Sequence, residues 1–245
     1  MKFSKMIVPC LALAALTAAC EDKEDPTTVG TTTTANVRFI NAVSGSGSMA
    51  LTSNGSMVGS SQSFFNSATS GTPTCSTVNT SSTGNAFSFG TANTGGTGIS
   101  GTATNFNQTL TSGGNYTVIA TGSSSNPSFI FLNNTATSTA PTGFANVRFV
   151  NATGNNNFDA FATSGTSLTG STASTTGLSS TNNQSGFVQV PTTNGTFTFT
   201  NNGSTTSVMQ TTPFALSSGG NYTVVLIPGT TAGTYQTLVY NNACS

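Results

Sequence analysis

Few side chains in this 245-residue sequence could take part in catalysis. The chain contains no histidine, and Asp159 is the single carboxylate side chain after residue 25. A serine nucleophile needs a base to activate it, and glycoside hydrolysis needs two carboxyl groups at a defined separation. Lys23 is the only lysine after residue 5, so no amine base is available further along the chain. The sequence therefore predicts a protein that is not an enzyme.

Metal and cofactor sites lack ligands in the same way. Zinc sites use several His or Cys ligands, and only two cysteines follow Cys20. The segment GNNNFDA (154–160) gathers oxygens of the kind that calcium prefers, but a single acid favours a plain turn. The segment GTGISG (96–101) fits a dinucleotide fingerprint, yet a poor helix start follows it and no acidic residue lies between Pro26 and Phe158. We expect no metal and no cofactor.

Arg38 and Arg148 are the only cationic side chains after Lys23, and they occupy the same place in ANVRFINA (35–42) and ANVRFVNA (145–152). Nucleic-acid binding needs clustered positive charge, so no nucleic-acid partner is expected. The two arginines could form a ligand-binding pair. Alternatively, each lays its stem along the fold and donates to backbone carbonyls, which the repeated position favours.

The N-terminus reads as an export signal. Residues 1–19 carry two lysines, an apolar stretch and then small residues, the pattern of a signal peptide. The final LTAAC resembles a bacterial lipobox, and we therefore expect lipid on Cys20. Thr17 departs from the pattern, because leucine is commoner at its position. The alternative is an ordinary signal peptide with Cys20 near the cut by chance. Residues 20–34 then form a lipidated tether, and the membrane is reached by acyl chains rather than by a spanning segment.

The remainder of the chain is written twice. Besides the arginine-containing segments, GGNYTV stands at 113–118 and again at 219–224, and FIFLNN (129–134) is matched by TLVYNN (237–242). A repeat of this length has the size of an independent domain. We expect homologous domains at 35–134 and 145–245, joined by a linker at 135–144.

The local pattern within each copy indicates β-strands. Short β-branched and aromatic runs are bounded by Gly, Asn and Ser, and Asn54-Gly55 is a strong hairpin signal. About seven strands per copy predict two tandem immunoglobulin-like antiparallel β-sandwich domains after the lipoprotein signal peptide. A single β-solenoid is the alternative, with a shorter period than the one found. Tyr116 and Tyr222 are expected in core or corner positions, and one of Tyr235 and Tyr240 could be exposed.

Two cysteines remain after Cys20. Cys75 lies in the part of the first copy that diverges from the second, and Cys244 is the penultimate residue. In an exported protein two such cysteines invite pairing, which would tie the C-terminus to the first domain. The sequence leaves open whether the two sulfur atoms come within reach.

Four elements of the second copy resemble the bacterial family of domain of unknown function 4397. They are ANVRFVNA, a hairpin that starts at Asp159, GFVQVPTTNGTFTF (186–199) and LSSGGNYTVVLIPG (216–229). The first copy departs from the pattern, with Met49 in place of the aspartate and a looser third element. Both copies read Asn-Ala where the family has His-Ala-Ser-Pro. The resemblance implies a secreted β-sandwich and no established activity.

These features predict a non-enzymatic lipoprotein of the bacterial cell envelope, in the outer membrane and facing either the surface or the periplasm. We expect it to present its domains for adhesion or for binding an extracellular matrix, glycan or protein partner. A structural component that self-associates is an alternative, because few charges protect its strand edges. A periplasmic ligand-binding module is another, and it would need a preformed pocket.

Overall fold

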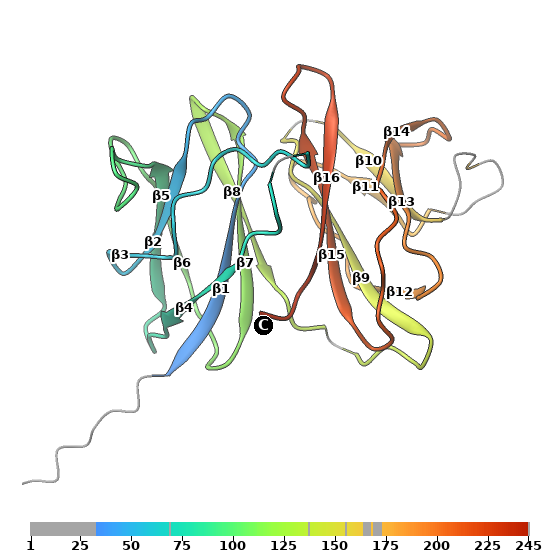
Figure 1. Ribbon diagram of the computed structural model, residues 1–245, viewed down its shortest axis with the longest axis horizontal. Helices are drawn as coiled ribbons and strands as arrows, with labels where there is room; N and C mark the ends of the chain where they lie inside the picture. Colours follow the sequence, from blue (N-terminus) through green and yellow to red (C-terminus); the bar gives the residue numbers. More distant parts are fainter. Residues whose placement is uncertain are drawn as a thin grey trace, which may run out of the picture. The chain divides into compact units, whose positions relative to one another are not determined.

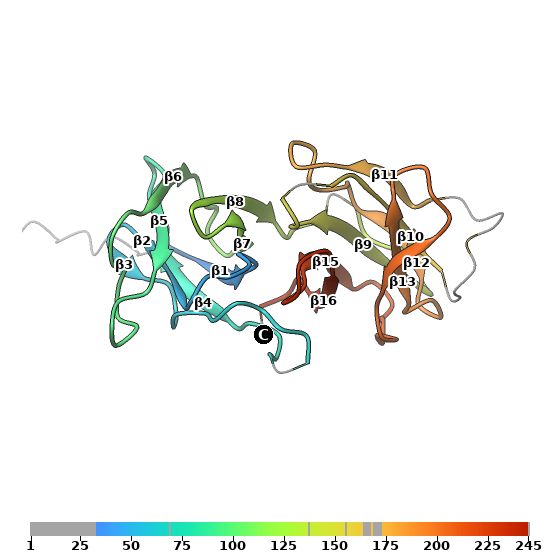
Figure 2. The ribbon, with the colours of Figure 1, turned by 90° about the horizontal axis from the view of Figure 1, so that it is seen from above.

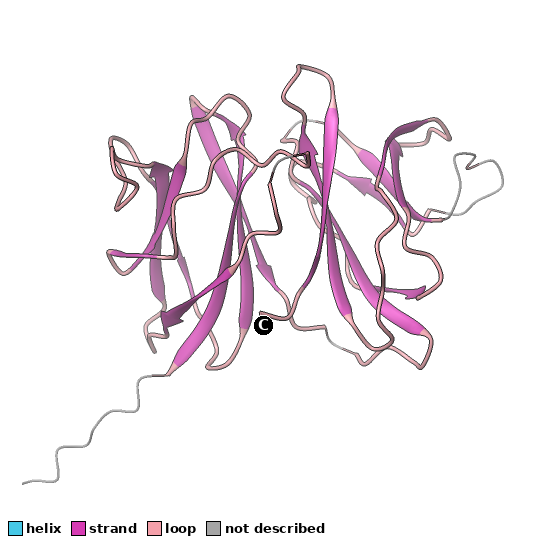
Figure 3. Cartoon of the chain, viewed as in Figure 1, coloured by secondary structure: helices cyan, strands magenta, loops and turns pink. Residues whose placement is uncertain are grey.

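The structure of the protein is a computed structural model. The structure describes residues 33–68, 70–136, 138–154, 156–163, 168 and 173–244, so residues 1–19, Cys20 and nearly all of the tether lie outside the described residues. All regular secondary-structure elements in the described residues are β-strands (Figure 3). No helix in these residues is long and apolar enough to cross a membrane. The prediction of an all-β protein is confirmed.

The N-terminal half (residues 33–136) builds two sheets. Its strands are β1 (Thr34–Asn41), β2 (Met49–Ser53), β3 (Ser56–Met57), β4 (Cys75–Asn79), β5 (Asn85–Thr91), β6 (Thr104–Gln108), β7 (Asn115–Ser123) and β8 (Asn126–Asn133). The inner sheet has the order β4-β1-β7-β8, and the outer sheet has the order β3-β2-β5-β6. β-branched and aromatic residues fill these strands because their side chains pack well on a pleated surface.

The C-terminal half (residues 138–244) repeats this arrangement. Its strands are β9 (Phe144–Asn151), β10 (Phe158–Ala162), β11 (Thr175–Leu178), β12 (Val188–Pro191), β13 (Phe197–Asn201), β14 (Ser207–Gln210), β15 (Asn221–Pro228) and β16 (Tyr235–Asn241). The inner sheet is β12-β9-β15-β16 and the outer sheet is β11-β10-β13-β14. Each strand therefore takes the place of the strand eight numbers before it, and the two β-sandwiches that the sequence predicts are present.

Each sandwich has its own core between its inner and outer sheets. Phe39, Phe87 and Phe89 lie in the N-terminal core, and Phe149, Phe197 and Phe199 lie in the C-terminal core. A hairpin joins β2 to β3 through Asn54 and Gly55, which both have positive φ, as a tight hairpin turn requires.

A third core lies between the two inner sheets, which stand side by side in both views (Figure 1, Figure 2). Ile40, Ile119 and Ile130 of the N-terminal half pack there with their repeat equivalents, Val150, Val225 and Leu238. Thr32–Ser245 accordingly form one compact unit. Because equivalent residues of both halves enter the same cluster, the contact has the pattern of a twofold interface between identical subunits.

Reciprocal hydrogen bonds cross the same interface. Arg38 of the N-terminal half donates from Nη1 to the Asn241 carbonyl at 3.1 Å. Arg148 of the C-terminal half donates from Nη1 to the Asn133 carbonyl at 2.7 Å. Since Asn133 and Asn241 are themselves repeat equivalents, the two contacts are related by the same pseudo-twofold relation as the apolar residues. A disulfide between Cys75 and Cys244 also joins the halves.

The strand order differs in detail from an immunoglobulin constant domain. Such a domain has seven strands in sheets of four and three, whereas each half here has eight strands in two sheets of four. The first strand also runs parallel to its neighbour, β1 beside β7 and β9 beside β15, within otherwise antiparallel sheets. These central strands are buried on both faces, since a core lies on each side of the inner sheet.

The repeated GGNYTV segment begins β7 and β15. The backbone N–H of Thr111 donates to the Tyr116 hydroxyl at 2.9 Å, and that of Ser217 donates to the Tyr222 hydroxyl at 2.9 Å. Both rings are buried. Each tyrosine therefore fixes the turn before its strand, and the core or corner position expected for it is confirmed. Tyr240 is buried as well, whereas Tyr235 is half-buried.

Candidate functional site

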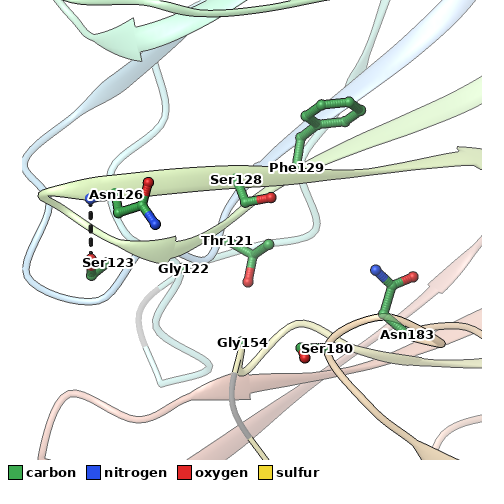
Figure 4. A pocket seen from close by; sticks show the side chains of 9 residues that line it. All are labelled: Thr121, Gly122, Ser123, Asn126, Ser128, Phe129, Gly154, Ser180 and Asn183. Atoms are coloured by element: carbon green, nitrogen blue, oxygen red, sulfur yellow. Dashed lines mark hydrogen bonds between the residues drawn. The ribbon is translucent and has the colours of Figure 1, made fainter.

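A cleft of about 400 Å³ opens between the two halves. Thr121, Gly122 and Ser123 of β7 line it together with Asn126, Ser128 and Phe129 of β8, and Gly154, Ser180 and Asn183 line it from the C-terminal half (Figure 4). One wall is thus formed by strands β7 and β8, and the other by the loops that follow β9 and β11. No charged side chain lines the cleft.

Alternation along β8 decides which side chains face the cleft. Ser128 is turned toward it, whereas the ring of Phe129 points away (Figure 4). The Phe129 ring instead stacks on Phe106 in the N-terminal half, with 4.0 Å between the ring centroids. The cleft surface is therefore made of hydroxyl groups, side-chain amides and glycine backbone, without an aromatic face.

Most of these polar side chains have no hydrogen-bond partner among the residues that the structure describes. The Thr121 hydroxyl donates to the Ala152 carbonyl at 2.6 Å and so joins the two walls. The side chains of Asn126, Ser128, Ser180 and Asn183 make no hydrogen bond to another described residue. Asn126, Ser128 and Ser180 are exposed to solvent and Asn183 is half-buried, so their donors and acceptors can exchange water for a molecule that enters the cleft.

The pseudo-twofold relation gives the cleft a counterpart at the other end of the interface. Thr121 pairs with Ser128 across the β7–β8 ladder, and Ile227 pairs with Gln236 at the equivalent point of the β15–β16 ladder. At that second end, Gln236 donates from Nε2 to the Phe65 carbonyl at 2.6 Å. It also accepts from the Ser67 backbone N–H at 2.8 Å. The Phe65 ring is buried in the third core, so this end of the interface is more nearly filled and keeps a smaller space of about 180 Å³, lined in part by Ser44 and Pro228.

Asn183 occupies the place that Phe65 has at the filled end. Phe65 is hydrogen-bonded through its backbone N–H to the Asn41 carbonyl, and the Asn183 carbonyl accepts from the N–H of Asn151, the repeat equivalent of Asn41. The loop that carries Phe65 spans residues 58–74, and the loop that carries Asn183 spans 179–187. The shorter loop and the smaller, polar side chains leave the larger space at the Asn183 end, about 400 Å³ against about 180 Å³ at the equivalent position of the other end.

Gly122 shapes the edge of the cleft. Its φ of +86° is strained for other residues, and a Cβ there would lie 2.7 Å from the Asn126 carbonyl oxygen. Any side chain at this position would therefore force the β7–β8 hairpin tip to move, and the cleft wall with it.

Comparison with protein families places the chain. The model of a domain of unknown function (DUF4397) matches residues 35–161, slightly more than half of the sequence. The chain belongs to this family. Within this DUF4397 chain, the matched part runs from β1 through the N-terminal half and on into β10. No curated protein matches the chain.

The sequence candidates of this DUF4397 chain lie away from the cleft. Arg38 donates from Nε to the Pro73 carbonyl at 2.9 Å, in addition to its bond with Asn241. Arg148 donates from Nη2 to Asn134 Oδ1 at 2.8 Å and to Thr223 Oγ1 at 3.0 Å. Burial lowers the pKa of both arginines. The nearby Tyr240 hydroxyl acts in the opposite direction and offsets part of this lowering. Both side chains thus donate to acceptors of the protein itself, in agreement with the structural alternative given for them above.

Asp159 has a local structural role in the C-terminal half. Its carboxylate accepts from the backbone N–H groups of Gly177 at 2.9 Å and Gly203 at 2.8 Å, and from Asn202 Nδ2 at 2.7 Å. Burial raises the pKa of the carboxyl group, but these hydrogen bonds outweigh it and hold the pKa below its usual value. The carboxylate oxygens are occupied by N–H donors, and no cluster of three metal-binding side chains occurs among the described residues.

We expect Asp159→Asn to destabilise the protein by about 2 kcal/mol at pH 7, because an amide cannot accept all three hydrogen bonds. The acid dependence should also change. Since the folded pKa lies below the unfolded value of about 3.9, the stability from Asp159 is complete above pH 5 and is lost as the pH falls through the folded pKa.

Urea unfolding from pH 2 to 8 tests both effects. The wild-type unfolding free energy should fall below about pH 4, and the difference between wild type and Asp159→Asn should shrink with it. A difference that stays constant at low pH would contradict the assignment of the acid-sensitive group.

The other sequence candidates fall in ordinary structural positions. GTGISG lies in the connection between β5 and β6 and is followed by a strand, so it does not form the strand–helix turn of a dinucleotide site. Cys20 lies outside the described residues. The cleft residues Thr121, Ser128 and Asn183 were not singled out from the sequence. Their signal lies where the two copies diverge, as in VIAT (118–121) against VVLI (224–227).

Proposed function

We propose that this DUF4397 protein is a non-enzymatic lipoprotein of the bacterial cell envelope, anchored through lipid on Cys20 and used for adhesion or for binding an extracellular ligand or matrix component. The observation that supports binding is the cleft between the halves, where four polar side chains make no hydrogen bond to another described residue. Binding sites commonly lie at such interfaces between structural units. The repeated strand order further supports the proposal that the C-terminal half is a second copy of the same domain.

Protease shaving of intact cells tests the location on which this role depends. The proposal expects the folded part to be cleaved from whole cells that express the wild-type protein. The Cys20→Ser protein, which cannot take lipid, should not stay with the cells. Survival of the wild-type protein until the envelope is opened would instead favour a periplasmic ligand-binding role and would reject adhesion.

A structural, self-associating component is the second candidate. The edge strands β6 and β14 of the two outer sheets have the sequences TNFNQ and SVMQ, which contain no charged residue. Lysines and other charges normally protect such edges from pairing with another chain. Light scattering of the lipid-free protein over a range of concentrations separates the candidates, because a strict monomer excludes assembly through these edges.

A further inference from the structure

We infer that the cleft between the two halves is a binding site for a neutral saccharide. The inference rests on the proposed role in binding extracellular ligands, and it names the class of ligand and the site. Its volume of about 400 Å³ lies in the lower part of the usual range for small-molecule sites and suits one or two sugar units.

The charges of the protein exclude an ionic ligand from this site. Arg38 and Arg148 donate to protein acceptors at the interface, and neither lines the cleft. Asp159 accepts three hydrogen bonds within the C-terminal half. These three are the charged side chains of the described residues, so an anionic or cationic ligand would lose its hydration without gaining a charged partner. The ligand must therefore be neutral.

The free polar groups of the cleft match a polyhydroxylated molecule. Asn126 and Asn183 each offer an amide oxygen as acceptor and an NH₂ group as donor, and Ser128 and Ser180 each offer a hydroxyl group that can do both. Sugar hydroxyls likewise donate and accept at once. An apolar ligand would leave these side chains without partners and would meet no aromatic face, because the Phe129 ring points away (Figure 4).

The filled end of the interface shows how the same location binds a neutral polar partner. There the Gln236 amide satisfies a carbonyl with its NH₂ group and an N–H with its oxygen, at Phe65 and Ser67. At the open end, Ser128 and Asn183 stand in the equivalent places of Gln236 and Phe65. The open end thus keeps the hydrogen-bonding character of this location while its internal partner is missing.

Titration of the isotope-labelled Cys20→Ser protein by NMR tests the inference. The neutral probes are glucose, galactose, mannose, N-acetylglucosamine and their β-linked disaccharides, and glucuronic acid and N-acetylneuraminic acid are the acidic probes. We expect at least one neutral probe to give saturable shifts at residues 121–128 and 180–183. The dissociation constant should be about 1 mM, as expected for a small ligand bound by a few hydrogen bonds. The acidic probes should give no such shifts.

The double substitution Ser128→Gln with Asn183→Phe copies the filled end into the cleft and should weaken binding at least tenfold. Asn182→Phe is the matched control, since Asn182 is exposed on the same loop and does not line the cleft. It should bind as wild type does. If the double variant does not show cooperative thermal unfolding, Ser128→Gln alone replaces it, with a weakening of at least threefold expected.

Three results would overturn the inference: no neutral probe shifts the cleft residues at 50 mM, the doubly substituted variant binds as well as wild type, or only the acidic probes shift the cleft residues. These results leave the proposed function standing if shaving shows that the protein faces outward. Conversely, a periplasmic protein that binds a neutral sugar in the cleft keeps the inference and rejects adhesion.

Discussion

Replacing Cys75 and Cys244 by serine is expected to lower the free energy of unfolding by about 5 kcal/mol. The disulfide joins residues 169 positions apart, and closing a loop of this length removes much of the conformational entropy of the unfolded chain. The bond also connects the start of β4, in the inner sheet of the N-terminal half, to the segment that follows β16. It therefore crosses the interface that the third core fills.

Guanidinium unfolding of the wild-type protein and of the doubly substituted protein measures this effect. A reducing agent should bring the wild-type midpoint to that of the Cys75→Ser/Cys244→Ser protein and should leave the variant itself unchanged. A loss below about 1 kcal/mol would show that the unfolded chain is not appreciably restricted by the bond, and it would contradict the expectation.

Substitution of Arg148 by methionine is expected to cost about 3 kcal/mol. Methionine keeps part of the apolar stem, but it leaves Asn133 O, Asn134 Oδ1 and Thr223 Oγ1 without their donor. Each buried acceptor without a partner costs about 1–3 kcal/mol. The variant no longer buries a charged guanidinium group, whose desolvation also lowers the arginine pKa, and this gain offsets part of the loss.

Arg38→Met is the matched comparison for this prediction. Arg38 is the repeat equivalent, and it donates to two backbone carbonyls while its guanidinium lies 4.3 Å from the centre of the Tyr240 ring. With one acceptor fewer, its loss should cost about 2 kcal/mol. Urea unfolding of both variants checks the order, and a larger loss for Arg38→Met would show that the hydrogen-bond count does not govern the interface.

Local sequence signals predicted the strands and turns of each half. The period of two along NYTVIA places Tyr116, Val118 and Ala120 in the N-terminal core, and Asn54-Gly55 forms the expected hairpin. The same alternation could not predict what packs against the other face of the inner sheet. Ile119 and Ile130 point away from that core, and only their contact with Val225 and Leu238 explains why they are apolar.

The cleft could not be predicted for a related reason. It depends on the different lengths and side chains of the loops 58–74 and 179–187. Strands define where each loop starts and ends, but no periodic sequence pattern predicts its course between them. From the sequence, Phe65 is an apolar residue in a polar loop, and nothing nearby indicates what it packs against. Its insertion into the third core, and the open space beside Asn183, follow from packing between residues distant in sequence.

The strand content and the roles of the equivalent tyrosines follow from residue types within a few positions of each other. The duplication and the shortage of charged side chains are visible directly in the 245 residues. The tertiary structure was needed to show that the inner sheets face each other, that Arg38 and Arg148 reach across to the opposite half, and that the two ends of the pseudo-twofold interface enclose unequal space. These features depend on which apolar faces meet, and such a contact is stabilised by groups from both halves together.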